Sequence, residues 1–147
     1  MRVTILAVGH KMPSWIEEGF REYTRRMPPE VRVDLVEMKP GKDKDAEGEK
    51  LLDALPEGAT LLALDERGKA VTTQGLSVML SEWMRDATHP AFAIGGAGGL
   101  SDAVKERASK LISLSALTLP HQLVRVVVAE QLYRAWSILA RHPYHRE

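Results

Sequence analysis

Short apolar segments alternate with helical segments along the chain, and this alternation restricts the possible folds more than any other feature. Nearly continuous apolar runs, rich in branched side chains, occur at residues 2–9, 60–64, 91–94 and 110–114. Such runs are typical of strands that are buried on both faces, as in a parallel sheet. Residues 31–38 instead alternate apolar and charged side chains, which predicts a half-exposed strand at a sheet edge.

Between these strands, apolar side chains recur at helical spacing. The pattern predicts helices over residues 13–27, 73–87 and 120–142, a short helix from Ser101 as N-cap to about residue 109, and another that ends near residue 55 after a mobile connection. The inward positions of the first two helices are Trp15, Ile16, Gly19, Phe20, Tyr23, Leu76, Met79, Leu80, Trp83 and Met84. Strands and helices alternate five times, so we predict an α/β fold: one domain over residues 1–147 with a parallel-rich, five-stranded sheet and helices on both faces.

Charge and residue usage limit the partners. Lys plus Arg and Asp plus Glu number 20 each, so the formal net charge is zero. A neutral chain lacks the basic excess that usually grips naked nucleic acid, and near-neutral proteins tend to self-associate. Cysteine is absent, which excludes disulfides and thiolate metal sites. We find neither a membrane-spanning run nor a secretory leader after Met1, and expect a cytoplasmic protein without membrane or metal partners.

The last helix carries apolar side chains around most of its circumference. They are Val124, Val126, Val127, Val128, Leu132, Trp136, Ile138 and Leu139. A sheet covers only one face of a helix, so a second protein surface is required to bury the rest. We favour a homodimer interface, and the alternative is a central core helix in a monomer.

Three strand ends are predicted to converge on one crevice. These are Leu64-Asp65, Ile94-Gly95-Gly96 at the start of the glycine-rich turn, and Leu114-Ser115. In open α/β sheets, ligands bind at the carboxyl ends of the strands. The glycine turn fits neither the dinucleotide nor the phosphate-loop spacing, and its spacing alone leaves a plain flexible turn open. No Lys or Arg lies in this turn or in residues 113–120, so we expect apolar side chains and backbone amides that suit a purine and a thioether.

Polar and aromatic side chains cluster at the C-terminus, where His142, Tyr144, His145 and Arg146 lie close together in sequence. Chain ends are usually frayed and without function, but this tail follows a well-anchored helix and can be held down. A metal site is a weak interpretation, because the two histidines have no cysteine partners.

Two other groups are candidates for contact with nucleic acid. His10 and Lys11 follow the first strand, at another strand end. Arg21 and Arg25 lie one turn apart on the first helix, next to Arg26. The arginines form either a solvated helix face or a patch that contacts phosphates.

Five motifs resemble a known family. Residues 113–121 (SLSALTLPH) and 123–126 (LVRV) look like a signature of the SPOUT superfamily of methyltransferases, in particular of its ribosomal RNA large subunit methyltransferase H family. Residues 9–13 (GHKMP), 130–137 (EQLYRAWS) and 142–147 (HPYHRE) are similar to it as well. The resemblance covers essentially the whole chain, and its C-terminal third is highly specific.

The resemblance implies a fold and an activity. The fold is an α/β sheet whose C-terminal segment forms a trefoil knot, a feature that composition does not predict. The activity is methyl transfer from S-adenosyl-L-methionine to N3 of a pseudouridine in the helix 69 loop of 23S ribosomal RNA, by a homodimer. Recognition of a folded particle by shape explains the zero net charge, so the assembled ribosome or its large subunit is the expected substrate.

The resemblance also assigns the cofactor pocket, to the same three strand ends. The residues carried over are Leu64, Gly95, Gly96, Ser115, Ala116, Leu117, Thr118, Leu119 and Pro120. Family members often have Gly-Gly-Pro-Glu-Gly in the glycine turn, whereas this chain has Ala97 and Gly98 in place of proline and glutamate. The carboxylate is therefore lost, and the role of the backbone carries over.

The chemistry assigns roles to the tail as a hypothesis. The acceptor is an imide nitrogen that must lose its proton, so the site needs a base or a cation that stabilises the deprotonated ring. We expect His145 to handle the proton, Arg146 to stabilise charge, and Tyr144 to stack on or orient the base. His10, Arg125 and Arg134 are second-rank candidates for RNA contact or support of the site.

Two other functions remain possible on the same fold. A nucleotide-binding sensor or adaptor could use the same crevice without catalysis. A flavodoxin-like redox domain needs a phosphate loop after the first strand, and residues 9–13 lack its Ser/Thr-rich character. The sequence leaves open the target nucleotide, whether pseudouridylation comes first, and which subunit completes each site.

Overall fold

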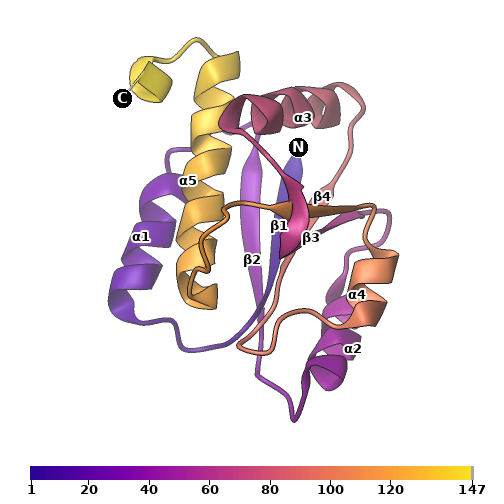
Figure 1. Cartoon of the computed structure of the whole chain (residues 1–147). Helices are drawn as coiled ribbons and strands as arrows, with labels where there is room; N and C mark the ends of the chain where they lie inside the picture. Colours follow the sequence, from indigo (N-terminus) through magenta and orange to yellow (C-terminus); the bar gives the residue numbers. More distant parts are fainter. Residues whose placement is uncertain (147) are drawn as a thin grey trace.

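The computed structural model describes residues 1–146 and contains one five-stranded sheet (Figure 1). Its strands are β1 (Arg2–Val8), β2 (Arg32–Met38), β3 (Thr60–Ala70), β4 (Pro90–Ile94) and β5 (Lys110–Ser113). Their order is β2-β1-β4-β3-β5, and every pairing is parallel. The predicted parallel sheet is confirmed, as is the position of residues 32–38 at its edge. The knot stays a prediction, because strand order alone does not establish threading.

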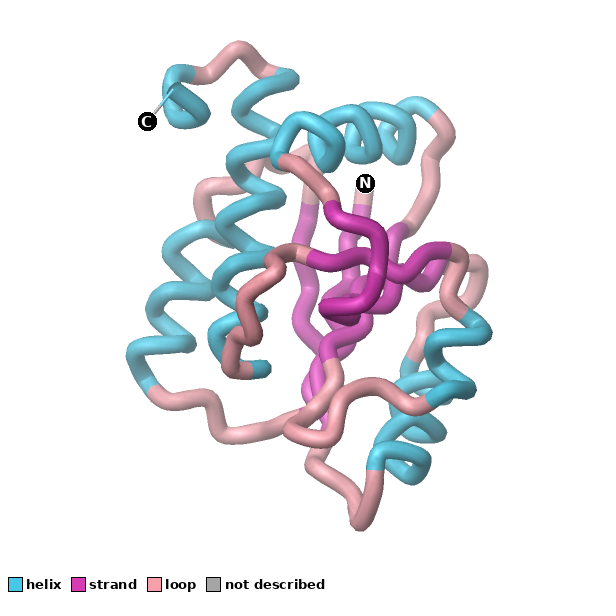
Figure 2. Tube along the Cα trace, viewed as in Figure 1, coloured by secondary structure: helices cyan, strands magenta, loops and turns pink. Residues whose placement is uncertain are grey.

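Helices cover both faces of the sheet, as predicted. They are α1 (Ser14–Thr24), α2 (Lys44–Ala54), α3 (Thr73–Arg85), α4 (Asp102–Arg107) and α5 (His121–Leu139), followed by the 3₁₀ helix η1 (Pro143–Arg146). α1, α3 and α5 pack on one face, and α2 and α4 on the other (Figures 1 and 2). Successive side chains of β1 point to opposite faces of the sheet and so contribute to both cores. Val3, Ile5 and Ala7 belong to one core, and Leu6 and Val8 belong to the other.

Helix starts follow the predicted capping. The Ser101 hydroxyl accepts a hydrogen bond of 3.3 Å from the Val104 N–H, which confirms the predicted N-cap of α4. The Asp43 carboxylate caps α2 in the same way, by accepting from the Ala46 N–H at 2.8 Å. Because α2 begins at residue 44, the polar stretch predicted as a mobile connection is partly helical.

The prediction for β3 was too short. We expected it to end at Leu64, but it continues to Ala70 and pairs with β5, with a shift in register between Leu64 and Lys69. The added residues are mostly polar, so they carry no apolar signal. Within this extension only Lys69 and Ala70 pair with β5, and residues 65–68 form an irregular segment between the paired positions. This segment places Asp65, Glu66 and Arg67 at the cavity beside the ends of the other strands.

Two inward-facing predictions were wrong. Trp15 is 62% exposed and Met84 is 39% exposed, whereas their neighbours Ile16 and Trp83 are buried, so these two side chains lie on the outward sides of their helices. α5 also ends earlier than predicted, at Leu139. Arg141 adopts a left-handed conformation with φ of +57°, and the His142 N–H donates to the Ser137 carbonyl at 2.8 Å. This arrangement closes the helix as a glycine commonly does.

α5 lies between α1 and α3, and contacts both (Figures 1 and 2). Val128, Ala129 and Leu132 are buried against the sheet and these two helices. Much of the apolar circumference of α5 is therefore covered within one chain. This agrees with the alternative to a dimer interface, a central core helix in a monomer.

Among residues 1–146, no helix is both long and apolar enough to cross a bilayer.

Candidate functional site

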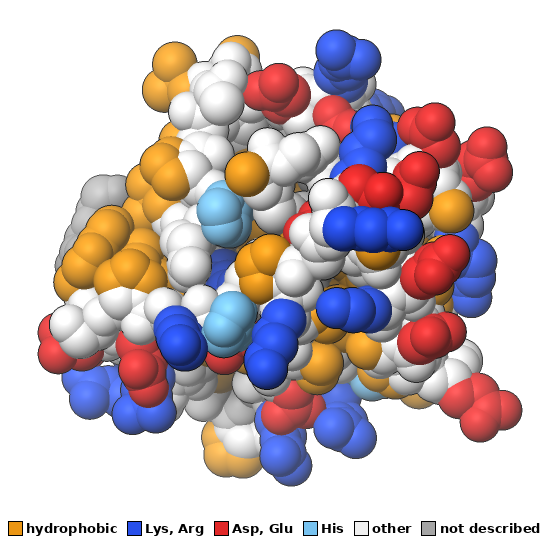
Figure 3. All heavy atoms as spheres, turned by 90° about the horizontal axis from the view of Figure 1, so that it is seen from below, with side chains coloured by type: hydrophobic (Ala, Val, Ile, Leu, Met, Phe, Trp, Pro, Cys, Tyr) orange, Lys and Arg blue, Asp and Glu red, His pale blue; other side chains and the backbone are white. Residues whose placement is uncertain are grey.

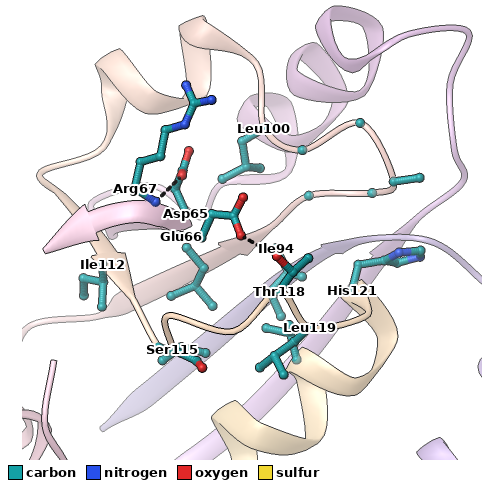
Figure 4. Close-up of a pocket in the computed structure, with 18 of the residues that line it drawn as sticks. Asp65, Glu66, Arg67, Ile94, Leu100, Ile112, Ser115, Thr118, Leu119 and His121 are labelled. Carbon is teal, nitrogen blue, oxygen red and sulfur yellow. Dashed lines mark hydrogen bonds between the residues drawn. The ribbon is translucent and has the colours of Figure 1, made fainter. Parts of the chain in front are cut away.

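A cavity of about 390 Å³ opens at the carboxyl ends of β3, β4 and β5 (Figure 4). The three strand ends that the sequence singled out all contribute to it, so their predicted convergence is confirmed. Of the residues assigned to the cofactor pocket, those that line the cavity are Leu64, Gly95, Gly96, Ser115, Leu117, Thr118 and Leu119. Ala116 and Pro120 belong to the same loop without lining the cavity. Their common role as cofactor ligands stays a prediction.

The floor of the cavity is apolar. Ile94 and Ile112 are almost completely buried, and Leu64, Leu114 and Val124 complete this part of the lining. Aliphatic side chains of this kind form a surface against which a flat ring or a thioether can pack. The expected preference for a purine over a bare phosphate suits this floor.

The glycine turn forms one wall from backbone alone. A Cβ at Gly95 would lie 2.6 Å from the carbonyl carbon of Gly99, closer than real side chains approach backbone. The Gly99 N–H donates to the Gly96 carbonyl at 3.0 Å, and Gly99 has φ of +81°. Position 95 therefore requires glycine, and the turn presents peptide groups to the cavity.

The loop between β5 and α5 forms the opposite wall. The Ser115 hydroxyl accepts from the Leu117 N–H at 2.9 Å, which fixes a tight turn. The Thr118 hydroxyl donates to a Glu66 carboxylate oxygen at 3.0 Å, so the loop is tied to the extension of β3. Leu117, in the same loop, is 74% exposed at the mouth of the cavity.

Charged side chains line the rim, which corrects the expectation of an apolar and amide lining alone. They are Lys44, Asp65, Glu66, Arg67 and Lys105, from α2, β3 and α4. Figure 4 shows Asp65, Glu66 and Arg67. Of the charged residues on the rim, only Asp65 was predicted to lie at a strand end, and the other four were missed because the sequence analysis considered only the three loops. The run Asp65-Glu66-Arg67 after an apolar strand was the available signal.

Asp65 is ionised on this rim. A hydrogen bond from Lys105, at 2.9 Å, and another from the Arg67 N–H, at 2.8 Å, hold the pKa of the Asp65 carboxyl below its ordinary value. Both signs of charge are therefore fixed at the mouth of the cavity.

The C-terminal tail lies at the other end of α5 (Figure 1). α5 has 19 residues, and at 1.5 Å per residue it is about 28 Å long. The tail folds back against the second half of this helix, whereas the cavity adjoins its first turn, and none of Tyr144, His145 and Arg146 lines the cavity. One chain does not bring the predicted catalytic residues and the cavity together. Glu147, the last residue of the tail motif, lies outside the described residues.

The tail is anchored through Tyr144. Its hydroxyl donates to Glu130 at 2.7 Å, and its ring lies 4.7 Å from the ring centre of Tyr133 and 4.7 Å from the Arg134 guanidinium. Burial and the Glu130 hydrogen bond raise the pKa of Tyr144, so the phenol stays protonated. The tail is thus packed against α5.

Glu130 also pairs with Arg134, one turn further along α5, whose Nε donates to it at 2.9 Å. Burial alone would raise the pKa of Glu130. Hydrogen bonds from Tyr144, Arg134 and Gln131 together hold the pKa of this carboxyl below its ordinary value. Nδ1 of His145 is buried and has no hydrogen-bond partner among the residues that the structure describes.

The basic residues that were candidates for contact with nucleic acid lie in two different surroundings. His10 and Lys11 are exposed on the loop after β1, on the face to which the strands' carboxyl ends lead. Figure 3 shows histidine, lysine and arginine side chains gathered on this face. Arg21 pairs with Glu17 at 2.7 Å and Arg25 with Glu22 at 2.5 Å, so acids on the same helix neutralise both. That pairing favours the solvated-face interpretation.

Arg125 is fully buried, at 0% exposure, which corrects the expectation of direct RNA contact and leaves that of support for the site. His121, which the candidate residues omitted, lines the cavity from the first turn of α5 (Figure 4). Its place directly after the Leu119-Pro120 pair was the signal. Within residues 1–146, no group of three His, Asp or Glu side chains is arranged to hold a metal ion.

The fold and its cavity at the strand ends define an α/β protein with a small-molecule site, and comparison gives its class. A family model described as "Predicted SPOUT methyltransferase" matches residues 1–145. The chain therefore belongs to the SPOUT methyltransferase family.

Within that family, it is similar to proteins called "Ribosomal RNA large subunit methyltransferase H". Those of Ralstonia pickettii (strain 12J) and Burkholderia lata (strain ATCC 17760 / DSM 23089 / LMG 22485 / NCIMB 9086 / R18194 / 383) are each 54% identical to it over 155 residues, with 99% of both chains covered. A solved structure, the SpoU methyltransferase AviRb from Streptomyces viridochromogenes in complex with AdoMet, has a TM-score of 0.49 and 14% identity, over 89% of this chain and 56% of that chain.

Proposed function

We propose that this chain is an S-adenosyl-L-methionine-dependent methyltransferase that methylates N3 of a pseudouridine in the helix 69 loop of 23S ribosomal RNA. One observation carries the proposal: the three segments that the resemblance assigns to the methyl donor form a single cavity. The printed names of the 54% identical relatives support ribosomal RNA of the large subunit as the substrate.

The cavity fits the donor in size and chemistry. Its volume of about 390 Å³ lies within the usual range for small-molecule sites. Ile94, Ile112 and Leu64 offer an apolar surface to an adenine ring and a thioether, while the backbone of the glycine turn allows close approach. The rim presents both signs of charge, which suits a zwitterionic amino-acid end. When bound, S-adenosyl-L-methionine supplies a methyl group on a sulfonium.

The residues of the chain have to orient the acceptor and remove its proton. An in-line transfer requires the acceptor nitrogen to be held in contact with the methyl group and aligned with it. His145 is our candidate for accepting the imide proton and Arg146 for stabilising the negative ring. The raised pKa of Tyr144 suits a hydrogen-bond donor that orients, not a base.

We propose that two copies complete each site. The tail of one chain packs against the second half of α5, while the cavity adjoins the first turn of the same helix, and no tail residue lines it. In a homodimer, the tail of one copy can reach the cavity of its partner. The partly exposed apolar side chains of α5, together with the exposed Leu117 beside the cavity, offer a surface for this contact.

The natural substrate in this proposal is the assembled ribosome or its large subunit, in the cytoplasm. A neutral protein of one domain gains little from bare phosphate charge, so recognition depends on the shape of folded RNA. Neither a metal nor a membrane takes part.

The test is incubation of the protein with methyl-labelled S-adenosyl-L-methionine and ribosomes. We expect label in 23S ribosomal RNA at N3 of one pseudouridine in helix 69, and loss of that methyl group in a deletion strain. Tight donor binding without transfer to ribosomes, subunits or RNA would instead favour a sensor or adaptor that uses the same cavity. Equal transfer to naked 23S RNA would contradict recognition of the assembled particle.

A further inference from the structure

The guanidinium of Arg125 connects three elements inside the protein. Arg125 lies near the start of α5, directly after the loop that forms one wall of the cavity. Its Nη1 donates to a Glu37 carboxylate oxygen on β2 at 2.6 Å, and its Nη2 donates to the Gly9 carbonyl at 2.7 Å. One buried side chain therefore holds α5 against the carboxyl ends of both β1 and β2.

The contact at Gly9 leaves no room for a side chain. A Cβ there would lie 3.1 Å from Nη2 of Arg125, and Gly9 has φ of +122°, a region that side chains rarely allow. The Gly9 N–H also donates to the Met38 carbonyl at 2.7 Å. The first residue of the loop after β1 is thus fixed through both of its backbone polar groups.

The loop itself has a strained conformation. Lys11 has φ of +59°, which is uncommon outside glycine and persists only where the surroundings impose it. Such strain concentrates at functional sites. His10 and Lys11 are both exposed, and Lys11 has no salt-bridge partner within residues 1–146.

This loop, residues 9–13, lies beside the cavity without lining it. His121 lies between the two: it lines the cavity, and its Nε2 is 3.7 Å from the position of a Cβ on Gly9. A ligand that fills the cavity leaves the loop free, so the loop is placed to contact the acceptor and not the donor.

Fold stability alone is a weak reason for burying an arginine here. Arg125 is fully buried but the Glu37 side chain is 33% exposed, so water weakens their attraction while the guanidinium still loses its hydration. Nε of Arg125 and Oε1 of Gln122 are also buried without hydrogen-bond partners among the described residues, an arrangement that further weakens the case for stability. What the pair does provide is a fixed geometry for the loop.

We propose that Arg125 and Glu37 form a positioning pair that holds residues 9–13 so that His10 and Lys11 bind the RNA acceptor beside the donor cavity. This inference rests on the proposed function for its substrate. The phosphate backbone is the group that Lys11 would bind, since its uncompensated charge faces solvent.

The test separates donor from acceptor. In Arg125→Lys, the charge remains but the two-pronged contact is lost, and we expect KM for ribosomes to rise at least about tenfold. The Kd for S-adenosyl-L-methionine should stay within about twofold. Lys11→Ala should raise KM in the same way with Tm unchanged. The matched control is Arg85→Met, which removes an exposed arginine paired with Asp86 on α3 and should change neither constant.

A double variant distinguishes positioning from direct contact. Arg125 acts through the loop that carries Lys11, so the two effects should not add. We expect KM for ribosomes in the double variant Arg125→Lys with Lys11→Ala to be at most about twofold higher than in whichever single variant has the higher KM. Additive effects, an unchanged KM in Arg125→Lys, or a parallel loss of donor affinity would overturn the proposal. Glu37→Gln serves in the same cycle if Arg125→Lys does not fold.

Amide hydrogen exchange gives a readout that does not depend on RNA. The Gly9 amide should exchange at least about tenfold faster in Arg125→Lys, while the amides of β4 stay protected as in the wild type. Unchanged exchange at Gly9 would overturn the positioning role. If the wild-type protein methylates no ribosomal RNA, the proposed function fails, and the exchange comparison still decides whether Arg125 holds the loop.

Discussion

The Tyr144 hydroxyl donates a hydrogen bond to Glu130. The phenol stays neutral, because burial and the neighbouring carboxylate raise the pKa of Tyr144. The residue therefore serves as an anchor whose ring and hydroxyl are both engaged within the chain. His145 and Arg146, the next two residues, take their positions from that anchor. The proposed roles of His145 and Arg146 thus depend on the hydrogen bond between Tyr144 and Glu130, which takes no part in the reaction.

Replacing Tyr144 with phenylalanine tests the anchor. The variant keeps the ring and loses the 2.7 Å hydrogen bond to a partly buried carboxylate, which contributes about 1 kcal/mol. We expect a Tm a few degrees lower and a clear fall in kcat, with the affinity for S-adenosyl-L-methionine unchanged. Thermal unfolding and single-turnover transfer measure the two effects. Full kcat in the variant would show that the hydroxyl does not position the tail.

His89, which is not part of the candidate site, makes the stability of the folded protein depend on pH. Burial, and then the charge of Arg2, lower the pKa of His89, which shares a hydrogen bond of 2.7 Å with Thr4. The unfolded chain therefore binds this proton more readily than the folded one. The stability that depends on neutral His89 is complete above about pH 6.5 and is lost as the pH falls below that value.

We accordingly expect the wild-type Tm to fall between pH 7 and pH 5 by more than that of His89→Gln, which cannot take up the proton. Calorimetry of both proteins across this range measures the difference. Parallel curves would contradict the assigned cause.

At the scale of elements, the glycine turn allows a matched comparison. In Gly95→Ala, the new methyl group would lie 2.6 Å from the Gly99 backbone, so the turn has to move. In Gly98→Ala, the nearest atom is Cβ of Lys44, 4.0 Å away. We expect donor affinity to fall at least about tenfold in the first variant and to change little in the second. Isothermal titration with S-adenosyl-L-methionine measures both, and equal affinities would contradict a donor site at this turn.

The tail is a second element with a separable role. Removal of residues 144–147 takes away the candidates for proton handling and leaves the cavity intact. We expect methyl transfer to be abolished and donor binding to remain nearly intact, measured by label transfer and by titration. A truncated protein of full activity would refute the assignment of the tail.

Elements were predictable from sequence wherever apolar side chains mark them. β1 and β4 are buried on both faces and read as apolar runs, and Ser101 marks the start of α4. The extension of β3 was missed because its residues are mostly polar, and only Lys69 and Ala70 pair with β5, beyond an irregular segment that no apolar pattern marks. Glu66 and Arg67 of the charged rim lie in that segment and were missed for the same reason. Lys105 comes from a different element, which local sequence cannot relate to the cavity.

At the scale of the whole molecule, the sequence predicted which strand ends meet and did not predict where the tail lies. Parallel strands bring their carboxyl ends to one edge, so Leu64, Gly95 and Ser115 converge by topology. The tail follows a helix of 19 residues, and the length of that helix carries it away from the cavity. A local motif contains no information about this separation, which only the packed fold supplies.

The central claim is that a cavity in one chain and the tail of another together methylate ribosomal RNA. Mixed dimers of Gly95→Ala and the chain lacking residues 144–147 test it most directly. At a donor concentration too low to fill the weakened cavity of Gly95→Ala, each variant alone has every site impaired in one half. Random assortment of the two subunits leaves one intact site in half of the dimers, so the account predicts about a quarter of wild-type transfer to 23S ribosomal RNA. A mixture that forms dimers, binds the donor and transfers no methyl group would contradict it.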